Sequence, residues 1–230
     1  MKLGGKMVTI NQYFSSVYPS AHVGILVICS VENITAHPAL EARKRELEAD
    51  LRSRFADKEI QVLEETSPLP AYTAYYKRFE KTYHVLGQLK SIIYKDKSVP
   101  SVSSLVESMF IAELKNGLLT AGHDLDRVEG ALSINVSTGD EHYTVMRGVD
   151  QQLKSGDLYI ADTQGILSAI IYGPDQRTQI TPETKNVLFT VYAPEGIDPK
   201  DVEKHLTYIR DLVLLVTPTA KVDMLQVIGQ

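Results

Sequence analysis

The segment 123–130, which reads His-Asp-Leu-Asp-Arg-Val-Glu-Gly, holds the densest group of side chains that could do chemistry. Imidazole and carboxylate groups are metal ligands, but their spacing here matches neither an EF-hand loop nor a zinc motif. We therefore expect no metal and no other cofactor. Asp124 and Asp126 also fit an Asx turn, in which carboxylates accept hydrogen bonds from nearby amides. Glu129 then belongs to a turn.

A second polar segment, Gln176-Arg177-Thr178, lies in a predicted hairpin connection. Nothing in such a connection demands these three residue types, so this segment is the best functional candidate by residue type alone. The chain has no Gly-x-Ser-x-Gly elbow and no Ser-His-Asp spacing, which argues against a covalent serine nucleophile. The single cysteine, Cys29, lies in an apolar run and is expected to be buried and unreactive.

Cations and aromatic rings are interleaved at 75–84, a combination that can bind an unpaired nucleic-acid strand. Tyr76, Lys77, Arg78 and Lys81 are the candidate RNA-binding residues. The alternative is that at least half of the tyrosines in this segment face the core. The first long helix also carries arginines, but its interleaved acidic residues indicate an ordinary solvated face.

The bulk composition restricts the class of protein. The chain has 230 residues, of which 43% are apolar and 23% charged, and its formal charge is −5. General nucleic-acid binders are usually basic, so we expect no DNA binding, and any RNA contact must come from a local patch. The longest apolar run, 23–31, is too short to span a bilayer, and no export signal is visible. These features predict a cytoplasmic protein.

Helices are predicted mainly in the first half of the chain and strands in the second. The first half contains a buried strand at 23–29, a short strand at 60–63, helices at 38–55, 72–83 and 85–94, and a capped helix that begins near Ser101 or Ser104. The second half contains hairpins at 131–146 and 157–172, a strand at 186–192, and a helix that begins at Asp198-Pro199.

This order predicts an α+β fold with a curved mixed β-sheet, a sandwich-like core and helices packed on it. We expect one domain over residues 21–217. Residues 1–20 would form an N-terminal extension, and residues 218–230 a tail or a last strand.

Three motifs occur in the order of a known domain: the segment 123–130, Ile160-Ala161-Asp162, and Thr-Pro-Glu-Thr-Lys-Asn-Val-Leu at 181–188. They resemble the B3/B4 editing and tRNA-binding domain of the phenylalanyl-tRNA synthetase beta subunit, and above all the free-standing proteins built from that domain alone. The resemblance covers the central half to two thirds of the chain. It implies a fold like that of the editing domain.

Two positions depart from the synthetase pattern. The family histidine that contacts the mischarged substrate aligns with Ala121, and His123 falls on a family phenylalanine. The family's editing glutamate aligns with Gln176, or with Asp175 if the register shifts by one. The resemblance therefore implies a pocket in the same place with a different lining, and tyrosine specificity does not carry over.

The resemblance implies hydrolysis of the ester of a mischarged tRNA, in trans, by a positioned water. His123, Gln176 and Thr178 would be the catalytic residues, since they would bind the ester or polarise water. Substrate binding would fall to four residues, with Arg177 at the tRNA terminus; these are Asp124, Asp126, Glu129 and Arg177. We expect the stretches around Asp126 and Arg177 to meet at one cavity.

Two other functions are consistent with the same sequence. One is a binding module that kept the fold and lost hydrolysis, which the residues at Ala121 and Gln176 and the acidic charge favour. The other is an esterase or amidase that acts on a free amino-acid derivative. Mischarged tRNAs, a salt-sensitive gel shift and a simple amino-acid ester would separate the three.

Overall fold

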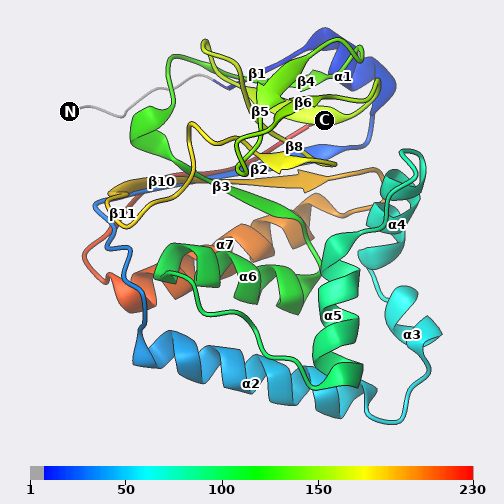
Figure 1. Ribbon diagram of the computed structural model, residues 1–230, viewed down its shortest axis with the longest axis vertical. Coiled ribbons are helices and arrows are strands. Elements are labelled where there is room, and N and C mark those ends of the chain that lie inside the picture. Colours follow the sequence, from blue (N-terminus) through cyan, green and yellow to red (C-terminus); the bar gives the residue numbers. More distant parts are fainter. Residues whose placement is uncertain (1–7, 230) are drawn as a thin grey trace.

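The protein, seen in a computed structural model that describes residues 8–229, consists of stacked layers (Figure 1). One layer is a five-stranded sheet in the order β1-β4-β7-β8-β9, and the next is a four-stranded sheet in the order β11-β2-β10-β3. Helices cover the outer face of the four-stranded sheet. The predicted α+β fold with a sandwich-like core and helices packed on it is confirmed, and the core is built from these two facing sheets.

The four-stranded sheet is entirely antiparallel. Its strands are β2 (His22–Cys29), β3 (Thr120–Asp124), β10 (Asn186–Ala193) and β11 (Lys221–Ile228). β2 is the predicted buried strand, and β10 confirms the strand predicted at 186–192. Since β3 is the last strand in the order, its outer edge is not paired with another strand in residues 8–229.

Two layers of helices lie below this sheet (Figure 1). α6 (Ser104–Asn116) and α7 (Pro199–Val216) pack against it, and α2 (Pro38–Phe55) and α5 (His84–Lys95) lie beyond them. Asp198 caps α7 as predicted, because its carboxylate accepts a hydrogen bond from the Lys200 N–H at 2.8 Å. α7 approaches β2 closely, since a Cβ on Gly24 would lie 2.7 Å from Val202.

The five-stranded sheet forms the opposite layer, where β1 is parallel to β4 and the other pairs are antiparallel. Its strands are β1 (Val8–Ile10), β4 (Leu132–Val136), β7 (Leu158–Ala161), β8 (Ile166–Ala169) and β9 (Gly173–Pro174). The predicted turn between β7 and β8 is present. The Asp162 carboxylate accepts hydrogen bonds there from the N–H groups of Gln164 and Gly165.

The other described elements are four short helical segments and a small sheet of β5 and β6. They are α1 (Gln12–Val17), α3 (Ile60–Glu64), α4 (Leu69–Lys77) and the 3₁₀ turn η1 (Leu125–Arg127), and the small sheet is β5 (His142–Thr144) with β6 (Asp150–Gln152). None of the helices in residues 8–229 is long and apolar enough to cross a bilayer.

Three local predictions were wrong. Residues 60–63 are helical because they lie among helices, where no strand edge is within reach. β4 and β5 form no hairpin, since the Glu141 carboxylate accepts hydrogen bonds from Thr138 and Gly139 and turns the chain toward β6. The predicted helix at 72–83 ends at Lys77.

Some further predictions concern segment ends. The N-cap position of the helix that starts at residue 104 is Ser103, which lies between the two serines that we considered and whose side chain makes no capping hydrogen bond. Part of the predicted extension, residues 1–7, lies outside the described residues. The domain boundaries stay predictions.

Candidate functional site

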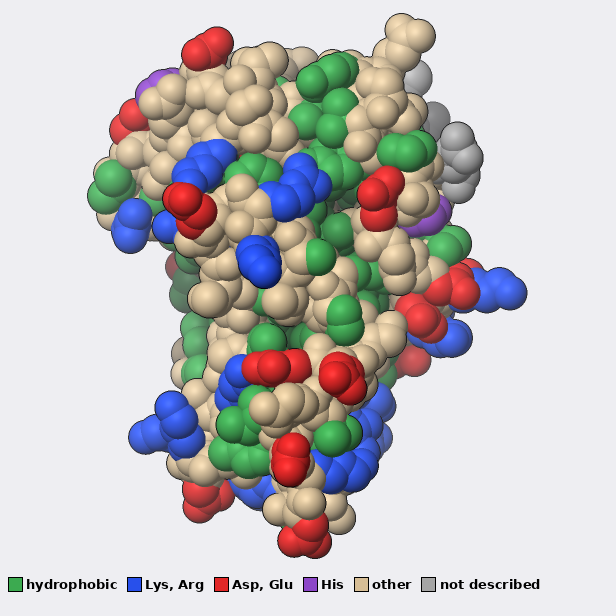
Figure 2. Space-filling model, turned by 90° about the vertical axis from the view of Figure 1, so that its right-hand side faces the viewer, with side chains coloured by type: hydrophobic (Ala, Val, Ile, Leu, Met, Phe, Trp, Pro, Cys, Tyr) green, Lys and Arg blue, Asp and Glu red, His purple; other side chains and the backbone are tan. Residues whose placement is uncertain are grey.

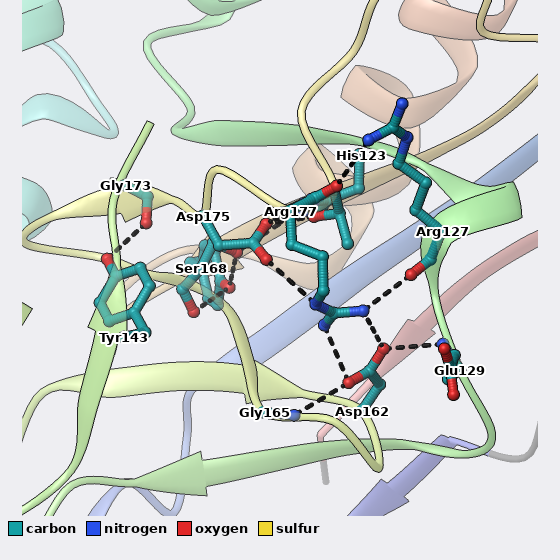
Figure 3. Close-up of polar contacts among 12 residues, drawn as sticks. His123, Arg127, Glu129, Tyr143, Asp162, Gly165, Ser168, Gly173, Asp175 and Arg177 are labelled. Atoms are coloured by element: carbon teal, nitrogen blue, oxygen red, sulfur yellow. Dashed lines mark hydrogen bonds and ion pairs between the residues drawn. The ribbon is translucent and has the colours of Figure 1, made fainter. Parts of the chain in front are cut away.

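The two polar segments singled out in the sequence lie side by side (Figure 3). The Asp124 N–H donates a hydrogen bond to the Thr178 carbonyl at 2.7 Å, and the Arg177 guanidinium donates one to the Arg127 carbonyl at 2.7 Å. These bonds fasten the end of β3 and η1 to the segment after β9. The structure thus brings the acidic bend and the Arg177 segment together.

The Arg177 guanidinium is fully engaged by neighbouring oxygens. It donates to both oxygens of Asp162 at 3.0 and 2.9 Å, and it lies 3.6 Å from the Asp175 carboxylate. Burial opposes ionisation of Asp162, but the hydrogen bonds from the Glu129 N–H and from Arg177 outweigh it and hold its pKa below the ordinary value. This geometry ties Arg177 into the scaffold, and its side chain is 35% exposed.

His123 is fully buried, and both ring nitrogens have partners. Nδ1 lies 2.8 Å from the Thr178 hydroxyl and Nε2 lies 3.2 Å from the Ser168 hydroxyl. Since the Thr178 hydroxyl donates to Asp175, it accepts the hydrogen bond from His123. Burial lowers the pKa of His123 to about 3, so the imidazole is neutral at physiological pH. We refer to His123, Asp162, Asp175, Arg177 and Thr178 as the Arg177 network.

The other predicted site residues lie at the rim of this network. Asp124 accepts hydrogen bonds from the Asp126 N–H at 3.1 Å and the Thr184 hydroxyl at 2.9 Å, which is the Asx turn that we considered. Asp126 accepts both of its hydrogen bonds from the Asn186 amide. Glu129 and Gln176 are exposed.

A cavity of about 320 Å³ lies next to the network, between α6, the edge strand β3 and residues 169–174. Its walls are mainly apolar, and Ala121 is among them. None of the predicted catalytic or substrate-binding residues lines it. A volume of this size suits a small ligand such as an amino acid with part of a nucleoside. We refer to it as the Glu113 cavity, after its one acidic wall residue.

Glu113 comes from α6 and is 2% exposed. Its Oε1 accepts a hydrogen bond from the Thr120 N–H at 2.8 Å, and no described residue donates to Oε2. Burial raises the pKa of Glu113 to about 8, so this carboxyl is poised to change its charge near neutral pH. Nothing in the sequence distinguishes this residue from other acidic positions on an amphipathic helix.

The edge of β3 supplies a second polar group. The N–H groups of Thr120 and Asp124 both point away from β10, toward Glu113 and Thr178. Along a strand, the backbone N–H and C=O groups of alternate residues point to the same side. Gly122 lies two residues from both Thr120 and Asp124, so its N–H and C=O groups also point away from β10. No described residue hydrogen-bonds to these two groups, and Gly122 lines the cavity. A Cβ here would lie 2.7 Å from Ile180, so glycine lets that side chain approach.

The predicted RNA-binding residues divide into two groups. Tyr76 is 3% exposed and donates a hydrogen bond to the Ile170 carbonyl at 2.8 Å, so its ring belongs to the core, as the alternative had it. Lys77, Arg78 and Lys81 are exposed.

A larger, more open depression of about 600 Å³ lies between α2 and α7. Its charged groups are of both signs and partner one another. Arg43 pairs with Glu46 at 2.8 Å, and Lys115 lies 4.0 Å from the centre of the Tyr208 ring. None of the sequence motifs reaches it. No metal-binding group of three or more side chains occurs among the residues described.

Comparison with known proteins places the chain in a family. Residues 70–216 match the B3/4 domain. The phenylalanine–tRNA ligase beta subunit of Fusobacterium nucleatum is 40% identical over 76 residues, which are 32% of this chain and 10% of that subunit. The beta subunit of Mycoplasma pneumoniae is 29% identical over 69 residues, which are 30% of this chain and 9% of that one. The aligned segment is therefore about a tenth of the length of these relatives.

A solved N-terminal fragment of the phenylalanyl-tRNA synthetase beta subunit from Pyrococcus horikoshii is also similar. It has a TM-score of 0.49 and 10% identity, over 97% of this chain and 54% of that fragment. The B3/4 match alone spans more than half of the chain, and it includes both the Arg177 network and the walls of the Glu113 cavity. This protein belongs to the B3/4 domain family.

Proposed function

We propose that the protein binds the aminoacylated end of a tRNA in the Glu113 cavity and hydrolyses the ester of a mischarged amino acid, acting in trans. The observation that carries the proposal is an apolar cavity of about 320 Å³ with a buried carboxyl and a free strand edge in its wall. The family match and the synthetase relatives support a tRNA ligand. The proposed site lies beside the residues that the sequence favoured.

The Glu113 carboxyl and the Gly122 N–H would have different roles in the reaction. An ammonium group beside Glu113 would lower the pKa of this carboxyl again, so binding of the amino acid would ionise the carboxyl and release its proton to solvent. The carboxylate then accepts a proton from a water whose oxygen attacks the ester carbon, while the Gly122 N–H donates to the carbonyl oxygen. The bond from carbon to the ribose oxygen breaks, the ribose oxygen takes up the proton, and free amino acid and tRNA leave.

Binding without hydrolysis is the second candidate, and one observation favours it. The predicted catalytic side chains do not reach the cavity, because His123 and Thr178 are held in the Arg177 network and Gln176 is exposed. A protein of this kind would bind the same RNA end and release it unchanged.

A panel of mischarged tRNAs, with a simple amino-acid ester included, tests the proposal. We expect one or a few of the tRNAs to be deacylated, and the Glu113→Gln variant to be about 100-fold slower. Glutamine keeps the volume and can still accept the hydrogen bond from Thr120. The matched control is Glu65→Gln, at an exposed acid outside both the cavity and the predicted site, and this variant should deacylate at the normal rate.

Three results would contradict the proposal. Salt-sensitive binding without hydrolysis would point to the second candidate. Hydrolysis of the free ester with no preference for tRNA would point to a small-molecule esterase. An active Glu113→Gln variant would move the chemistry away from this cavity.

A further inference from the structure

A shallow groove of about 450 Å³ continues the Glu113 cavity toward solvent. Four residues line both of them, namely Met146, Ile171, Tyr172 and Pro174. A ligand that extends out of the cavity therefore passes along this groove. The groove also has cationic residues of its own.

Lys81 and Arg147 line the groove, and both are exposed. Neither forms an ion pair with any carboxylate in residues 8–229, in contrast to Arg43 and Lys204, which pair with acids at 2.8 Å. On a chain with a net charge of −5, two unpaired cations beside a cavity mark a local site for anions.

Further cations follow the same side of the molecule. Arg78 stacks over the Tyr18 and Tyr75 rings, with its carbon Cζ 5.1 and 5.2 Å from their centres. Lys154 donates to the Phe79 carbonyl and lies 3.8 Å from Glu80, which is one acid within this basic region. Figure 2 shows Lys and Arg side chains gathered in the upper half of this side, around an acidic one.

The groove also offers apolar faces on which a base can lie. Tyr172 is partly exposed, and the Met146 side chain is 51% exposed. Base stacking on a ring face is tolerant of sequence, and it requires bases that are not paired. The combination of two free cations and stacking faces suits a short single strand better than a duplex.

We propose that this groove holds the single-stranded 3′ end of the RNA, with its phosphates on Lys81 and Arg147 and a base on Tyr172. This inference rests on the proposed function and adds the path by which the terminal nucleotide enters the cavity. It limits recognition to the last few nucleotides, because the chain is acidic overall and the described residues that line the groove include just two unpaired cations.

Fluorescence anisotropy with a labelled RNA oligonucleotide that ends in CCA tests the path without any need for hydrolysis. Two phosphate contacts give a slope of about −1.4 in log K against log salt concentration for a single strand. We expect the double variant Lys81→Ala/Arg147→Ala to bind on the order of tenfold more weakly and to lose most of that slope. Lys58→Ala, an exposed cation at the end of α2 with no acidic partner among the described residues, is the matched control and should bind normally.

The outcomes separate the path from the function. Unchanged affinity and slope in the double variant would overturn the path, even if mischarged tRNAs are deacylated. A double variant that hydrolyses 3′-aminoacyl-adenosine normally but mischarged tRNA on the order of tenfold more slowly would support both, because the small substrate has no phosphate to lose. A weakened double variant of a protein that deacylates nothing would support the path and refute the hydrolysis.

Discussion

The Arg177 network and the Glu113 cavity are neighbours that differ in how their polar groups are satisfied. In the network, the guanidinium, both Asp162 oxygens and the His123 ring all have partners within the chain. In the cavity, no described residue hydrogen-bonds to one Glu113 oxygen or to the backbone of Gly122. Satisfied polar groups stabilise a fold, and buried groups without partners are available to a ligand. The contrast is the basis of our proposal that the first region is scaffold and the second binds the ligand.

Removal of the network's central acid should produce the largest effect on stability. Asp162→Ala leaves a partly buried guanidinium and three backbone N–H groups without their acceptor. We expect the free energy of unfolding to fall by about 3 kcal/mol, measured by urea denaturation. Asp162→Asn keeps one oxygen that can accept hydrogen bonds from the backbone N–H groups. Its free energy of unfolding should therefore fall by about half as much. A loss under about 1 kcal/mol for the alanine variant would show that the network is not a scaffold.

The pH dependence of stability should reveal the buried acid of the cavity. The folded pKa of Glu113, about 8, lies above its ordinary value of 4.5, so the folded state binds the extra proton between these values. Its contribution to stability is complete below pH 4.5 and is lost as the pH rises through 8.

Comparison with Glu113→Gln isolates this effect, since Asp157 also has a pKa raised by burial, to about 7, and contributes in the same range. The fall in stability from pH 5 to pH 8 should be smaller in the variant by at least about 1 kcal/mol, measured by urea denaturation at each pH. If the free energy of unfolding changed with pH in the same way in both proteins, Glu113 would not be buried as an acid.

The smallest effect is expected at Gln176, the residue that aligns with the family's editing glutamate. Its side chain is exposed and outside the cavity, so Gln176→Ala should change the free energy of unfolding by no more than about 0.5 kcal/mol. We also expect deacylation to change by no more than about twofold. A large loss of activity in a stable variant would return the chemistry to the segment after β9.

The sequence predicted the scaffold better than the site. The aliphatic run predicted β2, the capping Asp198 predicted the start of α7, and the Asp162 turn predicted the β7–β8 hairpin. Residues close together in the sequence determine each of these features. Which strands pair with β4 depends on segments that are distant in the sequence, so a local sequence pattern cannot predict it.

The candidate site was harder to predict for a related reason. His123, Asp124 and Arg177 stand out in the sequence, and the structure does bring them together, but they bond mainly to one another and to the backbone. Glu113 owes its raised pKa to burial by several separate segments. Gly122 owes its free N–H to the place of β3 at the sheet edge. Neither property can be seen in the residue type.

A crystal structure with a non-hydrolysable analogue, in which an amide joins the amino acid to the 3′ position of adenosine, tests the binding site most directly. We predict that the amino acid lies in the Glu113 cavity, with its ammonium group within hydrogen-bonding distance of Glu113 and its carbonyl oxygen near the Gly122 N–H. An analogue bound against Arg177 and Asp162, or in the depression between α2 and α7, would contradict this assignment.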